Sequence, residues 1–140
     1  MIRSFVVVAL AGLSVAGVAS SALAAGDAAN GEKVFKKCMA CHKVDGKNGV
    51  GPMLNGVVGR AAGSAAGYSY SELNKSAAGA GLVWSEDNIK AYLPDPNAFL
   101  KKFLTDKGQA DKATGSTKMT FKLTDAGEID DVIAFLKTKN

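Results

Sequence analysis

The chain has 140 residues, enough for one ordinary domain and too few to argue for two. Its 17 Lys and Arg residues outnumber 13 Asp and Glu residues, which gives a net charge of +4. This excess is small, comes mostly from lysines and lacks a recognisable nucleic-acid-binding module, so it argues against nucleic acid as a partner. It does suit docking on acidic protein surfaces.

Residues 1–24 have the layout of a secretory signal peptide. A basic start through Arg3 precedes an apolar run over residues 5–18 and a small-x-small ending at residues 22–24. The run is shorter than the ~20 residues of a membrane-spanning helix; an uncleaved N-terminal anchor is the alternative. We predict cleavage within one residue of Ala24, which leaves a single exported domain over 25–140. With 16 basic and 13 acidic residues, that domain has a net charge of +3.

The remaining sequence predicts helices separated by glycine-rich loops, because no segment shows the alternating pattern of a strand. A first helix should begin at Asp27 or Asn30, which can both cap it. It places four residues at helical spacing: Gly31, Val34, Phe35 and Cys38. The many glycines of residues 43–70 then predict a long loop.

Three further helices are expected before a final one. Residues 71–78 can form a short helix, and Ser85 can cap a helix that Pro94 ends after residue 93. Pro96 suits the first position of a helix that stops near Gly108. This helix should bury one side, made of Phe99, Leu100, Phe103 and Leu104.

The last helix is predicted to open at Thr124 or Asp125, with Glu128 completing a capping arrangement. Its apolar stripe consists of Ile129, Val132, Ile133 and Leu136. We expect this stripe to pack on the first helix, where Gly31 permits close approach. The resulting core is small for a domain with so much loop, so another group should occupy its middle.

Both cysteines and the only histidine of the chain fall in residues 37–42, Lys-Cys-Met-Ala-Cys-His. The spacing C-x-x-C-H is the attachment signature of c-type haem, in which each thiol adds to one vinyl group and the histidine ligates iron. Three other interpretations are a redox dithiol, a structural zinc site and a plain disulfide. The first lacks a strand–helix–strand pattern, the second lacks a fourth ligand, and the third gives His42 no role.

A second axial ligand has to come from a methionine, because no second histidine is present. Met1 leaves with the signal peptide, and Met39 lies between the attachment cysteines. Met53 follows the histidine closely and is better interpreted as a core residue. Met119 lies far along the chain in a polar segment, and we predict it as the iron ligand.

These segments together resemble class I cytochromes c, and in particular the periplasmic cytochrome c2 group of bacteria. The likeness covers residues 26–42, the segment GVGPMLNGVVGR at 49–60, YSYSELNKS at 68–76, and AYLPDP with STKM at 91–96 and 116–119. It implies an all-α class I cytochrome c fold, with terminal helices packed together around one covalently bound haem c. The segment from Pro96 to Met119 is longer than in mitochondrial relatives, as is typical of the bacterial group.

The resemblance also implies roles for individual residues. Cys38 and Cys41 would carry the haem, with His42 and Met119 on the iron. The backbone carbonyl of Pro52 would accept a hydrogen bond from His42. The other implied contacts are Arg60, Tyr70, Trp84 and Thr117 near the haem propionates, Asn74 on an internal water, and Tyr92 beside the methionine.

An iron with two protein ligands has no vacancy for a substrate, so the expected function is one-electron transfer rather than enzymatic catalysis. A haem-based ligand sensor or a peroxidase-like enzyme is the alternative. The resemblance implies a monomeric periplasmic carrier in photosynthesis or respiration. Its donor would be a quinol-oxidising cytochrome complex, and its acceptor a photosynthetic reaction centre or terminal oxidase. The lysines expected to dock on acidic partner surfaces are Lys36, Lys37, Lys43, Lys118 and Lys122.

Overall fold

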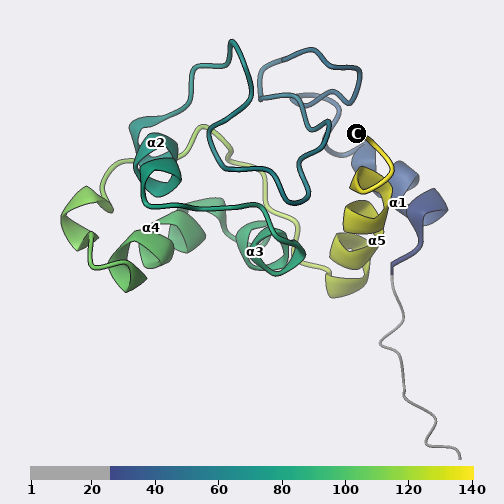
Figure 1. Cartoon of the computed structure of the whole chain (residues 1–140). Helices are drawn as coiled ribbons and strands as arrows, with labels where there is room; N and C mark the ends of the chain where they lie inside the picture. Colours follow the sequence, from purple (N-terminus) through teal and green to yellow (C-terminus); the bar gives the residue numbers. More distant parts are fainter. Residues whose placement is uncertain (1–25) are drawn as a thin grey trace, which may run out of the picture.

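The computed structural model describes residues 26–140, and the signal peptide predicted over residues 1–24 lies outside the described residues. This part of the chain is helical, which confirms the all-α class (Figure 1). A single isolated β-bridge joins Ala61 and Val83. Among residues 26–140 no helix is long and apolar enough to cross a membrane. The elements are α1 (Ala28–Phe35), α2 (Glu72–Gly79), α3 (Glu86–Tyr92), α4 (Pro96–Asp106), the 3₁₀ helix η1 (Ala110–Lys112) and α5 (Ala126–Leu136).

Each α-helix begins at a side chain that accepts a hydrogen bond from the backbone N–H three residues later. These capping residues are Asp27, Ser71, Ser85, Asp95 and Asp125. Such a cap satisfies one of the N–H groups that a helix start leaves without a partner. The predicted helix starts are therefore confirmed to within one or two residues.

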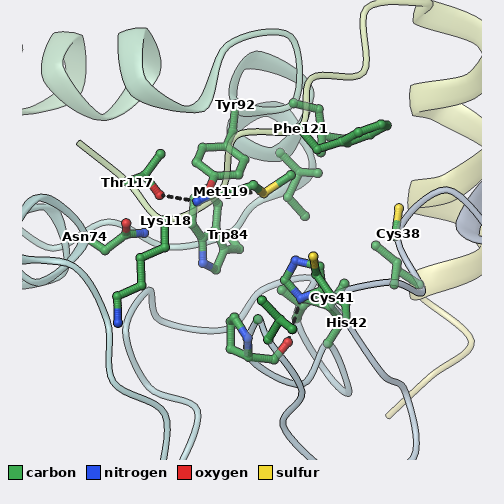
Figure 2. A pocket seen from close by; sticks show the side chains of 18 of the residues that line it. Cys38, Cys41, His42, Asn74, Trp84, Tyr92, Thr117, Lys118, Met119 and Phe121 are labelled. Carbon is green, nitrogen blue, oxygen red and sulfur yellow. Dashed lines mark hydrogen bonds between the residues drawn. The ribbon is translucent and has the colours of Figure 1, made fainter.

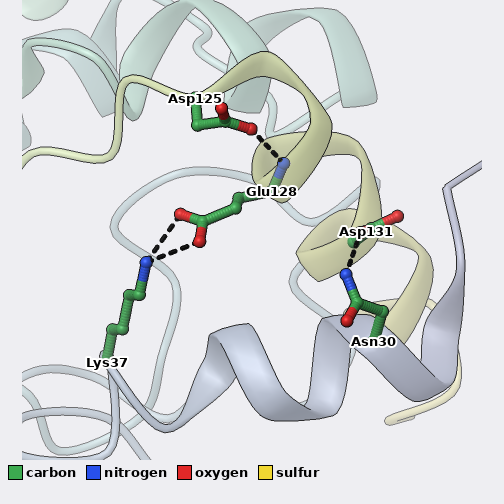
Figure 3. Close-up of polar contacts among 5 residues, drawn as sticks. All are labelled: Asn30, Lys37, Asp125, Glu128 and Asp131. Carbon is green, nitrogen blue, oxygen red and sulfur yellow. Dashed lines mark hydrogen bonds and ion pairs between the residues drawn. The ribbon is translucent and has the colours of Figure 1, made fainter.

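Two local predictions were wrong. The regular part of α1 ends at Phe35, and residues 36–41 continue as tight turns, with the Cys38 N–H donating to the Phe35 carbonyl at 2.8 Å. The carboxylate of Glu128 does not complete a capping box, because both of its oxygens lie 2.7 Å from the Lys37 ammonium (Figure 3). The Glu128 carboxylate thus binds Lys37, which is distant in sequence, instead of the backbone N–H at the start of its own helix.

Helices α1 and α5 pack directly against each other, as predicted (Figure 1). A Cβ atom at Gly31 would lie 1.9 Å from the Asp131 carbonyl oxygen, so only glycine fits at this contact. Beside it the Phe35 and Phe135 rings lie 5.2 Å apart. The Asp131 carboxylate accepts hydrogen bonds from the Asp27 N–H and the Asn30 amide. Apolar and polar contacts therefore both hold α1 against α5 at the same place.

The buried side chains form two separate clusters. One joins α1, α3 and α5 and includes Val34, Ile89 and Ile133. The other joins α2 and α4 and includes Leu73 and Leu100. Trp84 packs against both. The two halves of the fold consequently meet along a seam rather than through one continuous core.

We predict that Gly31→Ala lowers the free energy of unfolding by about 2–3 kcal/mol, because the added methyl group would force the α1 and α5 backbones apart. Chemical denaturation of the haem-loaded protein measures this change. Gly79→Ala is the matched control, since a Cβ there meets nothing within 4 Å. It should be neutral or stabilise by about 0.5–1 kcal/mol. Equal effects of the two substitutions would contradict the close contact as the cause.

Candidate functional site

A cavity of about 280 Å³ lies beside the first cluster, with Phe35, Ile89 and Leu136 in its lining, and Trp84 and Tyr92 form its wall toward the second cluster. Its walls are mainly apolar and come from segments distant in sequence, including Leu54, Trp84, Leu123 and Leu136. Three cationic side chains line it, Lys37, Arg60 and Lys118, and no carboxylate among the residues that the structure describes does so. The cavity therefore suits a large apolar group that carries negative charge at its edge.

The C-x-x-C-H motif forms one end of this cavity. Cys38 and Cys41 are both free thiols that line it, Cys38 being partly buried and Cys41 exposed. The turn that carries them is closed by the His42 N–H, which donates to the Cys38 carbonyl at 2.9 Å. Burial raises the pKa of the Cys38 thiol, so this sulfur is held in its neutral form.

The His42 ring is fixed in both orientation and tautomer. Its Nδ1 lies 2.7 Å from the Pro52 carbonyl oxygen, the contact that the resemblance implied. A carbonyl can only accept, so Nδ1 carries the proton and Nε2 keeps its lone pair. Burial, the largest effect, lowers the pKa of His42 despite this hydrogen bond, which favours the neutral ring. The imidazole is thus prepared as a metal ligand.

Gly51 makes the close approach behind this ring possible, a role that the sequence pattern did not predict. A Cβ atom there would lie 2.6 Å from His42 Cε1 and 2.9 Å from Nδ1. The Gly51 N–H also donates to the Cys41 carbonyl at 2.8 Å. The loop at residues 49–52 therefore lies directly against the imidazole, and the Gly-Pro dipeptide was its only sequence signal.

Met119 lines the same cavity opposite His42 (Figure 2). The Tyr92 hydroxyl donates to the Met119 sulfur at 3.5 Å, and the Met119 N–H donates to Thr117 Oγ1 at 3.3 Å. Burial raises the pKa of Tyr92 to about 12, so the hydroxyl keeps its proton at neutral pH. Met39 and Met53 do not line the cavity. Of the methionines that the structure describes, only Met119 faces the group the cavity would hold.

The donors expected near a carboxylate lie along the cavity, although some have protein partners. Arg60 donates through Nη1 to the Asn55 carbonyl and through Nη2 to the Met53 carbonyl, at 2.9 and 3.0 Å. Its Nε is buried without a partner. The Tyr70 hydroxyl accepts from the Ala65 N–H at 3.0 Å, which leaves its proton available. The other expected contacts that line the cavity are Asn74, Trp84 and Thr117.

The predicted docking lysines differ in their surroundings. Lys37 and Lys122 are paired within the chain, the first with Glu128 and the second with Asp95, both at 2.7 Å. The Lys118 ammonium donates to the Ser69 carbonyl. Lys36 and Lys43 are exposed and take part in none of the ion pairs found among residues 26–140.

Two exposed apolar side chains at the cavity were also missed. Val50 is 75% exposed and Phe121 is 41% exposed, and both line the cavity. Val50 belongs to the loop beside His42, whereas Phe121 follows Met119. No local pattern distinguishes them from core residues, because their exposure depends on how the two loops meet.

Comparison with known proteins agrees with this geometry. The sequence model of the family described as cytochrome c matches residues 28–140. The chain belongs to the cytochrome c family. A cytochrome c2 from Rhodopseudomonas palustris is 69% identical over 112 residues, covering 80% of this chain and 97% of the relative. Cytochrome c2 iso-1 from Rhodospirillum centenum is 63% identical over 115 residues, covering 81% and 96%.

Solved structures of cytochromes c2 have the same fold. The ferricytochrome c2 structure from Rhodopseudomonas palustris superposes with a TM-score of 0.79 at 62% identity, covering 81% of this chain and 99% of that one. Cytochrome cH from Methylobacterium extorquens gives 0.64 at 45% identity, covering 81% and 100%. The predicted membership of the cytochrome c2 group is confirmed. The chain is an electron-transfer protein with one covalently attached c-type haem, and not an enzyme.

The residues present fit such a group. The cavity has apolar walls for the porphyrin, two free thiols and one neutral imidazole at one end, and a thioether opposite. The cationic lining and the unpartnered Nε of Arg60 suit the haem carboxylates, since a desolvated carboxylate needs paired donors. A haem in this cavity would cover the apolar side chains that line it, including Leu54, Ile89 and Leu136.

We predict that Gly51→Ala displaces the His42 ring and lowers the free energy of unfolding of the haem-loaded protein by about 1–3 kcal/mol. The displacement should also change the NMR signals of the imidazole, which the helix substitution Gly79→Ala should leave unaltered. An imidazole spectrum in Gly51→Ala identical to that of the parent would contradict the close packing.

Proposed function

We propose that this protein is a periplasmic one-electron carrier whose haem is joined to Cys38 and Cys41 and ligated by His42 and Met119. One observation carries the proposal: the imidazole and the thioether line a single cavity from opposite sides, beside the two thiols. Thioether and imidazole ligation together favour the ferrous state and raise the reduction potential. Export is supported by the signal-peptide layout of residues 1–24.

When bound, the haem supplies exchange of one electron at its iron, with little change in ligation. The side chains of this chain keep that ligation fixed. Pro52 holds the His42 tautomer, and Tyr92 holds the Met119 sulfur through a hydroxyl that stays protonated. The apolar walls exclude water, so reorganisation on electron transfer stays small. Arg60 and Tyr70 are proposed to bind the haem carboxylates.

We predict that Met119→Ala abolishes the weak long-wavelength absorption of methionine-ligated ferric haem and lowers the reduction potential. Visible spectroscopy and redox titration measure both. Met53→Leu is the matched control, since it replaces a methionine that does not line the cavity with a side chain of similar volume. Retention of the band in Met119→Ala would show that another residue is the ligand, and its loss in Met53→Leu would identify that residue.

We further propose that a quinol-oxidising cytochrome complex donates the electron and that a photosynthetic reaction centre or terminal oxidase accepts it. Such partners would be recognised through the exposed lysines that lie in or beside the haem-attachment motif and the Met119 segment, of which Lys37 and Lys118 line the cavity. Lys36, Lys43 and Lys118 support this recognition best, because Lys37 and Lys122 are already paired with carboxylates. The exposed Val50 and Phe121 would add apolar contact between the charges.

The docking proposal predicts that oxidation by the acceptor slows steeply as salt is added, because exposed charges more than about 10 Å apart are screened at 0.1 M ionic strength. Lys43→Gln/Lys118→Gln should slow the reaction several-fold at low salt. Lys101→Gln/Lys107→Gln changes the net charge equally but alters α4 and the residue that follows it, neither of which lines the cavity. A flat salt dependence, or equal slowing by the two pairs, would rule out docking through Lys43 and Lys118.

A further inference from the structure

The segment that carries Met119 has no regular structure of its own. Residues 113–123 contain neither helix nor strand, and Gly115 has a φ of +75°. Thr117 is nevertheless only 7% exposed, and it is the one buried polar side chain among the residues described. Something outside the segment must therefore fix it in place.

One such contact comes from the first turn of α4. The Asn97 Oδ1 accepts a hydrogen bond from the Thr117 N–H at 2.8 Å. The Thr117 hydroxyl oxygen in turn accepts from the Met119 N–H at 3.3 Å. A chain of two hydrogen bonds thus connects α4 with the backbone of the proposed ligand.

The far end of the segment is tied to the same corner of the fold. The Leu123 N–H donates to the Leu93 carbonyl at 2.9 Å, and the Lys122 ammonium lies 2.7 Å from Asp95 Oδ2. Residues 117–123 are therefore held at both ends by residues 93–97, which comprise the connection after α3 and the first two residues of α4. Of the contacts that residues 93–97 make with this segment, the one made by Asn97 lies nearest to Met119 along the chain. Tyr92 contacts the Met119 sulfur itself, and Lys118 donates to the Ser69 carbonyl.

The Asn97 side chain is not needed to start its own helix. Asp95 caps α4 by accepting from the Ala98 N–H at 3.0 Å, and Pro96 occupies the first helical position. The Asn97 side chain can therefore accept the hydrogen bond from the Thr117 N–H without leaving α4 uncapped. Loss of this amide should loosen the segment while α4 stays formed.

We propose that Asn97 is a positioning residue that keeps Met119 seated in the cavity through Thr117. The inference rests on the proposed ligation by Met119. Without the Asn97 acceptor, a buried Thr117 N–H loses its partner, and openings that withdraw Met119 become more frequent. Asn97 would thereby set how readily the sixth position of the iron exchanges.

The test is the rate at which imidazole binds the ferric, haem-loaded protein and bleaches its long-wavelength band. Asn97→Leu should raise this rate about fivefold, the change expected for one lost hydrogen bond. Asn97→Asp keeps the acceptor oxygen and should restore a rate close to that of the parent. The matched control is Asn88→Leu, which removes a side-chain hydrogen bond to Val83 from the first turn of α3 and should leave imidazole binding unchanged.

The possible outcomes distinguish the role of Asn97 from the proposed ligation by Met119. A parent protein without the band would overturn ligation by Met119 and, with it, the role of Asn97. A parent with the band and an Asn97→Leu rate equal to that of the parent would overturn the role of Asn97 alone. The same holds if Asn88→Leu accelerates binding as much as Asn97→Leu, since the effect would then be one of general stability.

Amide hydrogen exchange in the unsubstituted protein provides a second readout if Asn97→Leu fails to fold. The Thr117 N–H should exchange at least about tenfold more slowly than the exposed Ser116 N–H, because only the former is bonded to Asn97. Equal exchange of the two amides would overturn the proposal.

Discussion

The separation of the core into two clusters is the constraint on which the rest of the structure depends. Trp84 packs against both clusters, and an apolar cavity lies beside the first, with Trp84 and Tyr92 forming its wall toward the second. Leaving such a surface open to water would forfeit the burial that stabilises a small domain. A covalently attached haem resolves this, because it cannot dissociate and it offers apolar area to both halves. Haem binding therefore contributes directly to the stability of the folded chain.

Features with local causes could be predicted from the sequence. The helix starts follow from capping side chains such as Ser71 and Asp125, and the attachment motif follows from the spacing of Cys38, Cys41 and His42. These signals lie within a few residues, so no tertiary information is needed to interpret them. The packing of Gly31 against α5 was also predictable, because a glycine on an apolar helix face lets a second helix approach closely.

Features that depend on how the folded chain surrounds a side chain could not be predicted in this way. Glu128 has the position of a capping residue, yet Lys37 lies 91 residues away in sequence and takes its carboxylate. Arg60 has the chemistry of a carboxylate ligand, but two of its donors hold the carbonyls of Met53 and Asn55. Sequence separation alone does not decide the partner, because that of Glu128 is 91 residues away whereas those of Arg60 are five and seven residues away.

Burial favours the neutral form of three groups that line the cavity. It raises the pKa of Cys38 and Tyr92 and lowers that of His42, so in all three cases it favours the neutral form. The phenol and the imidazole thus contribute no charge where the porphyrin would lie, and haem attachment would convert the Cys38 thiol into a neutral thioether. The remaining lining charges are the cations Lys37, Arg60 and Lys118. Because these cations match a group whose negative charges are the carboxylates at its edge, the cavity is complementary to haem in electrostatics as well as in the placement of its ligands.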